Sequence, residues 1–191
     1  MGPLGATTLY IAETPLVRIR EKRIEDAEND FAWRRDPELA TLDATKPISL
    51  SFEEFLAQLQ RDLLTPDPSR RAYALEAPDG THIGNIMYYN GDSPGGSAEF
   101  GIVVADPRHR GHGVGTTATV AFLRYLWQTR PFRLIYLHTL EWNEPARRCF
   151  AAAGFDETAR VFRKQQWFTR METRREWWLM WDMEGRFVLN P

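Results

Sequence analysis

The stretch that decides the fold is residues 102–116, I-V-V-A-D-P-R-H-R-G-H-G-V-G-T. An apolar strand stops at an Asp-Pro pair, a basic glycine-rich turn follows, and a helix begins directly after the turn. The first N–H groups of a helix lack intrahelical partners and lie at the positive end of the helix dipole. Because Gly111, Gly113 and Gly115 leave the backbone open to an anion, we predict that this turn binds phosphate.

Spacing separates three kinds of glycine-rich loop. A P-loop requires a lysine after its last glycine, and this segment contains none. The dinucleotide-binding pattern G-x-G-x-x-G fails because Thr116 stands where its third glycine is required. The pattern R-x-x-G-x-G fits, with Arg108, Gly111 and Gly113 in register. On its own this pattern is equally compatible with a basic turn that binds nothing, so the assignment depends on the rest of the chain.

A second motif lies about thirty residues downstream. Residues 133–139, R-L-I-Y-L-H-T, are typical of a buried strand. A helix should begin near Asn143, because asparagine is a good N-cap and proline is tolerated in the first turn, and it should end near Gly154. Residues 143–155 thus read N-x-x-A-x-x-x-F-x-x-x-G-F.

Together the two motifs resemble the acetyl-CoA-binding segments of the GNAT superfamily of N-acetyltransferases. The lead-in A-E-F-G-I-V-V-A-D-P-R and the chain length are similar to the branch with ribosomal-protein N-terminal and polyamine acetyltransferases. The resemblance implies an α+β fold, a single domain with a mixed, mostly antiparallel central sheet flanked by helices. We expect this domain at residues 14–184, between a flexible N-terminal segment (1–13) and a C-terminal tail (185–191).

Apolar periodicity and turn residues predict the individual elements. We expect strands at 16–20, 71–76, 82–89 and 98–104, and helices at 24–35 and 51–64, the latter with Ser51 and Glu54 in capping-box spacing. The helix after the glycine loop should bury one face, made of Val114, Ala118, Ala121, Phe122 and Tyr125. Residues 161–168 and 176–183 are expected to form a final hairpin.

The resemblance implies a set of residues that hold acetyl-CoA. They come from the strand end, the glycine loop and the second helix: Ile102, Val103, Val104, Arg108, His109, Arg110, Gly111, His112, Gly113, Val114, Gly115, Thr116, Asn143, Ala146, Arg148 and Phe150. A bulge or splay is expected in strand 98–104, with Gly101 consistent with a bulge. The backbone N–H of Val103 is expected to polarise the thioester carbonyl.

The family mechanism implied by the resemblance is direct attack of a neutral amine on the thioester within a ternary complex. Glu99 matches a position where many relatives carry a glutamate that accepts the amine proton through water. Phe150 replaces a tyrosine that protonates the departing thiolate in many relatives, and phenylalanine has no proton to donate. The neighbouring Cys149 is more simply a small core residue, so the acid stays unassigned.

Four residues are candidates for the acceptor side: Trp33, Asp43, Glu99 and Trp178. Asp43 lies in the loop expected to cover the acceptor, and Trp33 is as easily explained as a core residue of its helix. Trp178 belongs to an aromatic segment with Trp177 and Trp181. If that segment is a strand, both of its faces are apolar, which suits a strand buried on both sides, a dimer contact or an aromatic acceptor wall.

Composition excludes several classes of protein. With 43% hydrophobic and 26% charged residues, the chain is typical of a soluble domain, and it has no run long enough to span a membrane and no secretory signal, so we expect a cytoplasmic protein. One cysteine excludes an intramolecular disulfide, and the four histidines suggest no metal site. The net charge of −2 argues against nucleic-acid binding.

Charge is unevenly distributed along the chain. Residues 21–54 contain ten acidic and five basic residues, whereas arginines gather around the expected CoA site. This asymmetry suits a cationic acceptor, although mixed charge on solvated helix faces explains it equally well. We therefore predict an acetyl-CoA-dependent N-acetyltransferase that acts on a small cationic amine or a protein N-terminus, and we expect it to form a homodimer. The alternative, which Phe150 admits, is a non-catalytic acyl-CoA-binding module.

Overall fold

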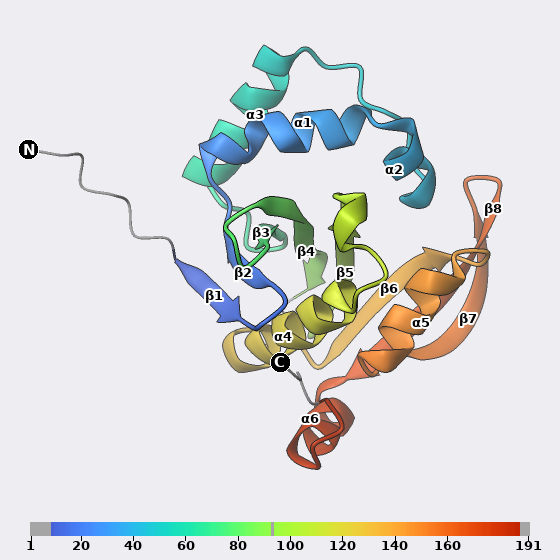
Figure 1. Ribbon diagram of the computed structural model, residues 1–191. Helices are drawn as coiled ribbons and strands as arrows, with labels where there is room; N and C mark the ends of the chain where they lie inside the picture. Colours follow the sequence, from blue (N-terminus) through green and yellow to red (C-terminus); the bar gives the residue numbers. More distant parts are fainter. Residues whose placement is uncertain (1–8, 93, 188–191) are drawn as a thin grey trace, which may run out of the picture.

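The computed structural model describes residues 9–92 and 94–187 of the chain (Figure 1). Eight strands form one sheet in the order β1-β2-β3-β4-β5-β6-β8-β7. The strands are β1 (Tyr10–Glu13), β2 (Arg18–Glu21), β3 (Arg71–Glu76), β4 (His82–Asp92), β5 (Ser97–Val104), β6 (Leu134–Leu140), β7 (Asp156–Arg163) and β8 (Gln166–Arg174). The α-helices are α1 (Ala27–Arg35), α2 (Pro37–Leu42), α3 (Phe52–Leu64), α4 (Val114–Thr129), α5 (Glu144–Ala152) and α6 (Arg175–Met183).

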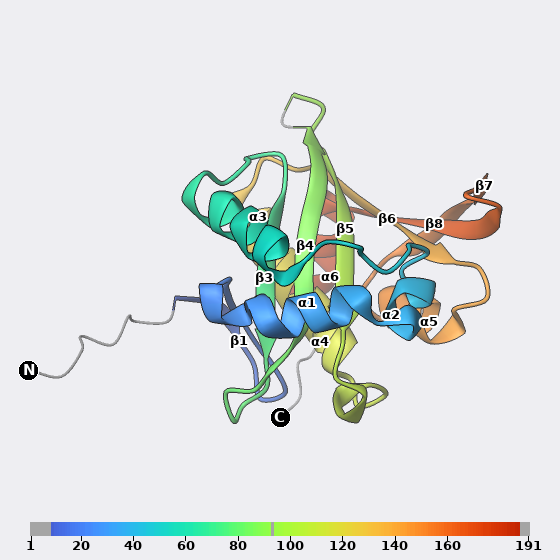
Figure 2. The ribbon, with the colours of Figure 1, turned by 90° about the horizontal axis from the view of Figure 1, so that it is seen from above.

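The sheet is mixed and mostly antiparallel, as the sequence predicts. Only β5 and β6 pair in parallel, because α4 connects them as a crossover. Helices α1 and α3 lie over one face of the sheet, and α4 lies against the other (Figures 1 and 2). Val114, Ala118, Ala121 and Phe122 of α4 are buried as expected.

Strands β5 and β6 separate partway along their length. Their pairing covers only Ser97–Glu99 of β5 against residues 134–136 of β6. Beyond this point β5 stays paired with β4 up to Val104, whereas β6 pairs with β8 up to Leu140, so a wedge-shaped gap opens between them (Figure 2). The β4–β5 register is continuous across Gly101, so the strand splays without a bulge there.

The expected final hairpin is partly wrong. Strands β7 and β8 form a hairpin over residues 156–174, but the aromatic segment that follows is helix α6. A helix resolves the conflict of two apolar strand faces: Trp178 is fully buried, Trp181 packs partly against the core, and Trp177 is 52% exposed. The tail also contributes to the core, since Phe187 stacks on Trp178 with ring centroids 4.8 Å apart.

Two further differences concern short elements. Strand β1 pairs with β2, so the sheet begins at Tyr10, inside the segment expected to precede the domain. Helix α2 forms between the two expected acceptor-side helices because Asp36 caps it and Pro37 occupies its first turn. The remaining part of that expected flexible start, residues 1–8, lies outside the described residues. Among the helices that the structure describes, none has the length and apolarity to cross a bilayer.

A buried ionic cluster joins the start of α1 to the sheet. The Arg20 guanidinium donates to Asp26 at 2.8 and 2.9 Å and to Glu76 at 2.6 Å, and all three residues are buried. Burial alone would raise the pKa of Asp26, but the hydrogen bond from Arg20 and the charge of Lys22 hold this pKa at about 2. The cluster fixes the helical layer over the sheet face that carries the acceptor side of the site.

Candidate active site

The glycine loop presents unpaired backbone donors at the start of α4. Gly113 caps this helix with φ of 81° and offers no side chain, and Gly111 has φ of 77°. The first hydrogen bond of the helix runs from the Thr117 N–H to the Gly113 carbonyl at 2.9 Å. Within the described chain, the N–H groups of residues 114–116 therefore have no acceptor. This arrangement fits an anionic group such as the pyrophosphate of CoA.

The two arginines of the loop are engaged by the protein itself. Arg108 is exposed and pairs with Asp106 at 2.7 Å, and this hydrogen bond lowers the pKa of Asp106 to about 2. Arg110 donates to the carbonyls of Val104 and Ala105 at 2.9 and 2.8 Å and pairs with Glu38 of α2 at 2.7 Å. Arg110 thus holds the end of β5 through hydrogen bonds, whereas the sequence alone suggests a residue that contacts the cofactor.

His109 and His112 differ in their surroundings. His109 Nδ1 lies 3.5 Å from the Asp106 carboxylate, whereas His112 is exposed in the loop. His112 is free to approach a bound phosphate, and His109 mainly supports the turn.

The backbone of β5 lines the gap, but not through the residue that we expect from the sequence. The Ala105 N–H donates to the Ile83 carbonyl of β4 at 2.8 Å. Because N–H directions alternate along a strand, the Val103 N–H also faces β4, and the N–H groups of Ile102 and Val104 face the gap. The assignment of the oxyanion donor to Val103 is therefore corrected: Ile102 and Val104 offer the open backbone edge.

Helix α5 forms the other wall of the cofactor side. Asn143 Oδ1 accepts from the Ala146 N–H at 3.3 Å, which confirms the expected cap, and the Asn143 amide nitrogen donates to no group of the described chain. Ala146 is half-buried, and exposed Arg148 pairs with Glu144 at 2.9 Å. Asn143 thus caps α5 and keeps its amide N–H groups unused by the described chain.

Phe150 and Cys149 belong to the packing of the two helices. Phe150 is 8% exposed and its ring centroid lies 6.0 Å from that of Phe100, inside the core. A Cβ on Gly115 would lie 3.2 Å from Cys149 Sγ, so glycine allows α4 to approach α5. Burial raises the pKa of the Cys149 thiol, and a protonated thiol is a poor nucleophile. Cys149 is therefore a packing residue, and neither it nor Phe150 offers an acid.

Glu99 lies where the gap begins and has two hydrogen-bond partners. Its Oε1 is 2.8 Å from Nδ1 of His138 on β6, and its Oε2 accepts from Asn90 Nδ2 at 3.0 Å. Arg163 Nη2 lies 3.9 Å from Oε1. The side chains of Glu99 and His138 are only 7% and 9% exposed. The structure therefore assembles a buried carboxylate–imidazole pair at the point where β5 and β6 separate.

Aromatic and charged groups from neighbouring strands enclose this pair. Tyr89 of β4 lies directly across from Glu99, and its pKa is raised by burial and by the charges of Glu99 and Asp43. Burial likewise raises the pKa of Tyr136, with Glu99 adding to the effect. Burial also raises the pKa of Asp43 despite its partly exposed surface. Asp43 thus lies near the Glu99 site, as expected from its loop.

A cavity of about 480 Å³ extends from Tyr89 along the same face of the sheet, beneath α1 and α3. Its apolar lining comes from α3, the preceding loop and β4: Ile48, Leu50, Phe55, Leu59, Leu63 and Met87. Each lining carboxylate has a basic partner, Glu21 with Arg71 at 2.8 Å, Asp30 with Lys22, and Asp62 and Asp67 with Arg70 at 3.0 and 3.8 Å. The cavity therefore has an apolar lining, and each carboxylate at its rim is paired with a basic side chain, although residues 21–54 are rich in acidic residues.

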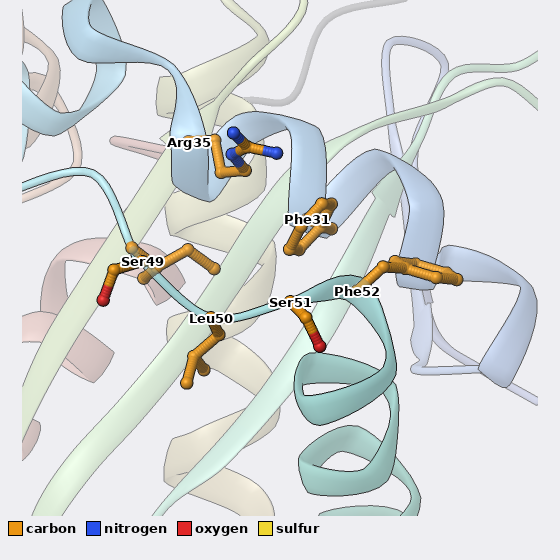
Figure 3. Close-up of a pocket in the computed structure, with 7 residues that line it drawn as sticks. Phe31, Arg35, Ser49, Leu50, Ser51 and Phe52 are labelled. Carbon is orange, nitrogen blue, oxygen red and sulfur yellow. The ribbon is translucent and has the colours of Figure 1, made fainter.

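A second depression lies between α1 and the loop before α3. Figure 3 shows Phe31 and Arg35 projecting from α1 toward residues 49–52. Its volume is about 340 Å³, and its seven lining residues include no carboxylate, histidine or cysteine. Arg35 stacks on Phe31 at 5.4 Å from the ring centroid, so this depression contains no group suited to proton transfer.

Two acceptor-side candidates lie elsewhere. Trp178 is buried behind α5, where its Nε1 donates to the Ala153 carbonyl at 2.9 Å, so its assignment to the acceptor side is wrong. A Cβ on Gly154 would meet Trp178 at 3.0 Å, which explains the glycine there. Trp33 packs edge-on against His82 with centroids 4.7 Å apart and does not line the cavity.

The structure reveals functional candidates that the sequence analysis missed. Tyr89 and Asn90 come from β4 and His138 from β6, and they converge on Glu99 of β5 only in the folded protein. Alternation along β6 was the one available signal, since His138 is a polar residue on a strand otherwise dominated by buried apolar side chains. Among the described residues, no group of three or more His, Cys, Asp or Glu could hold a metal ion.

Comparison with known proteins agrees with this geometry. The model of the acetyltransferase (GNAT) domain family matches residues 17–156. A search of curated protein sequences finds no significant match.

Two solved structures share the fold. The spermidine N-acetyltransferase from Vibrio cholerae, in complex with CoA and spermine, is 22% identical, with 86% of this chain and 98% of that chain covered and a TM-score of 0.77. The aminoglycoside acetyltransferase AAC(6')-Ib, in complex with coenzyme A, is 20% identical, with coverage of 84% and 95% and a TM-score of 0.69. At this identity the likeness concerns the fold alone.

Proposed function

Because the chain belongs to the GNAT family of acetyltransferases, we propose that it transfers the acetyl group of acetyl-CoA to a small primary amine. One observation carries this proposal: β5 runs from a buried Glu99–His138 pair, where it separates from β6, to a helix N-terminus with free N–H groups. The first suits the anionic donor, and the second suits the removal of a proton from the acceptor.

The transfer proceeds by direct attack within a ternary complex. The free N–H groups at the start of α4 hold the pyrophosphate, and the open β5 edge at Ile102 and Val104 holds the extended arm with Asn143. An N–H on that edge stabilises negative charge on the carbonyl oxygen during attack. Because the phenyl ring of Phe150 has no proton to give, water protonates the departing thiolate, for which an ordinary thiol pKa of about 8.5 is low enough.

The cavity indicates what the acceptor amine looks like. Its volume suits a small molecule rather than a folded protein surface, and its lining is apolar. The carboxylates around it are already paired with arginine or lysine, so a polyamine would find no unpaired anion there. We infer an acceptor with one primary amine at the Glu99 end and an apolar body under α3, in preference to a polyamine or a protein N-terminus.

A free-thiol release assay with acetyl-CoA tests this function. Hexylamine and phenethylamine should accelerate CoA release more than spermidine or a short peptide does. If no amine in the panel accelerates release while CoA still binds tightly, the protein is the non-catalytic acyl-CoA-binding module instead. If spermidine is the best acceptor, the inference about the apolar body is wrong and the acetyltransferase assignment stands.

Two broader proposals concern the whole protein. We propose that it works in the cytoplasm and that it forms a homodimer through exposed aromatic groups of the β7–β8 hairpin, where Phe162 is 59% and Trp167 41% exposed. Light scattering coupled to size-exclusion chromatography should give twice the mass of one chain for the wild-type protein. The Phe162→Ser variant should give the mass of a single chain.

A further inference from the structure

We propose that His138 is the catalytic base of the transfer and that Glu99 is a positioning residue that orients it. This inference rests on the proposed function and deepens it, because the sequence alone favours Glu99 as the proton acceptor. It is drawn from the geometry of the pair on two neighbouring strands.

The hydrogen bonds of Glu99 leave it little capacity to act on a substrate. Its Oε1 faces His138 Nδ1 at 2.8 Å and its Oε2 accepts from Asn90 at 3.0 Å. The side chain is 7% exposed. A carboxylate only accepts hydrogen bonds, so the shared proton belongs to Nδ1 of the imidazole. With the Nδ1 hydrogen directed at the carboxylate, Nε2 is the ring nitrogen that is left to accept a proton.

The second ring nitrogen of His138 is the open acceptor. Nε2 has no hydrogen-bond partner in the described chain, and it is not among the polar atoms that are buried without one. By contrast, Nδ1 of His82 is enclosed and unpartnered. His138 therefore combines one nitrogen fixed by a carboxylate with a second nitrogen that can receive a proton.

The position of His138 on β6 directs this nitrogen to the reaction. Parallel pairing of β5 and β6 ends at Glu99 and Tyr136, and His138 is the next β6 residue on the same face. His138 is thus the first residue on this face beyond the paired stretch, where the two strands separate. An acyl group held along the β5 edge therefore ends beside the imidazole, on the face that carries the acceptor cavity.

Charged and titratable groups from each adjoining strand face the pair. Arg170 of β8 is paired across from His138, but it stacks on Tyr136 at 4.0 Å and binds Glu172 at 2.7 Å. Arg163 of β7 lies 3.9 Å from Glu99. From β4, Tyr89 lies opposite Glu99, and the charge of Asp43 reaches it from the covering loop. A guanidinium is already protonated and has no acceptor atom, so neither arginine can replace His138 as the group that receives the proton.

The chemical step is balanced by these groups. The amine nitrogen forms a bond to the acetyl carbon and the carbon–sulfur bond breaks, with its electron pair leaving on the thiolate. The proton lost by the nitrogen passes to His138 Nε2, while Glu99 stabilises the imidazolium through Nδ1. Solvent then takes this proton and supplies one to the thiolate, which restores the neutral ring.

Steady-state kinetics of His138→Gln across pH, with the acceptor that works best in the amine panel, tests the assignment. We expect kcat to fall about 100-fold to 10,000-fold, the acidic limb of the kcat/KM profile to disappear, and the Kd of CoA to stay unchanged. Glu99→Gln keeps an oxygen that can accept from Nδ1, so its loss should be smaller. His82→Gln, which removes a histidine whose side chain is 6% exposed and lies outside the site, should keep the acidic limb.

His138→Gly with added imidazole separates a catalytic role from a structural one. Partial recovery of kcat by imidazole, in a variant that still binds CoA, supports proton transfer at this position. The proposal is overturned if His138→Gln keeps the wild-type rate and pH profile, or if Glu99→Gln costs more than His138→Gln. These outcomes require a wild-type protein that acetylates an amine, so they are distinct from failure of the proposed function.

Discussion

The Glu99–His138 pair lies where β5 and β6 begin to separate, and the glycine loop follows the far end of β5, yet the two features are built in opposite ways. The loop draws its donors from backbone N–H groups within residues 111–116, and most of it is exposed. The pair is made of side chains from two strands 39 residues apart, and both side chains are at least nine-tenths buried. The donor site is therefore a local feature of the chain, whereas the acceptor site exists only when the sheet and its helical cover are complete.

The largest effect is expected for Gly113→Val, which should weaken binding of CoA and leave the acceptor side intact. A valine at Gly113 needs a φ near 81° that a β-branched residue avoids, and it displaces the anion from the helix start. Loss of two charge-assisted hydrogen bonds worth about 1.5 kcal/mol each should raise the Kd of CoA at least ~100-fold, as measured by calorimetry.

Gly185→Val is the matched control, because Gly185 has φ of 78° and open space around it outside the site. It should carry the same backbone strain and leave CoA affinity unchanged. Equal losses of affinity in the two variants would contradict the phosphate-binding role of the loop.

Acid should destabilise the helical layer over the acceptor side through protonation of Asp26. The pKa of Asp26 is about 2 in the folded protein against an ordinary value of 3.8, so the unfolded chain binds the proton more readily. The stabilisation is therefore fully present above about pH 4 and is lost as the pH falls toward about 2, a change of about 2 kcal/mol. Urea unfolding at several pH values measures it.

Asp26→Asn should remove this part of the pH dependence and also weaken the fold at neutral pH, because Arg20 would keep only one of its two buried carboxylate partners. An unchanged slope of stability against pH in Asp26→Asn would show that other carboxylates cause the acid sensitivity.

Shortening a side chain that lines the cavity should weaken binding of the acceptor amine and leave binding of CoA unchanged. Leu59→Ala removes apolar surface from the lining, and a loss of about 1 kcal/mol of contact predicts a roughly fivefold higher KM for an apolar amine. Leu64→Ala, on the same helix but 83% exposed, is the control and should leave KM unchanged. A higher Kd for CoA in Leu59→Ala would show that the two sites are not separate.

The smallest expected effect concerns the arginine that makes the sequence motif recognisable. Arg108 is exposed and held by Asp106, so Arg108→Ala should raise the Kd of CoA only about threefold, in the range of a surface ion pair. The effect should shrink as salt is added. A loss as large as that of Gly113→Val would mean that Arg108, rather than the backbone, holds the phosphate.

The sequence predicts the locally encoded glycine loop and helix caps better than it predicts the acceptor side. The strand, loop and helix of residues 97–129, the Ser51 cap and the Asn143 cap depend on neighbours within a few positions, and the structure confirms them. The aromatic segment 175–183 was misassigned, because alternation and helical spacing both fit a run so rich in tryptophan.

The acceptor side was harder to predict because long-range pairing creates it. His138 meets Glu99 only because the parallel β5–β6 pairing stops at Tyr136, and no local pattern encodes that end point. The acidic character of residues 21–54 was equally misleading as a sign of a cationic acceptor. In the folded protein those carboxylates cap helices or form ion pairs: Asp36 caps α2, and Glu38 pairs with Arg110.

The most direct test of the central claim is a rapid-quench measurement of both products with acetyl-CoA and an apolar primary amine. Direct transfer predicts that the acetylated amine and free CoA form in equal amounts and at one rate, and only when both substrates are present. Release of CoA without the amine, or without an acetylated product, would contradict the account.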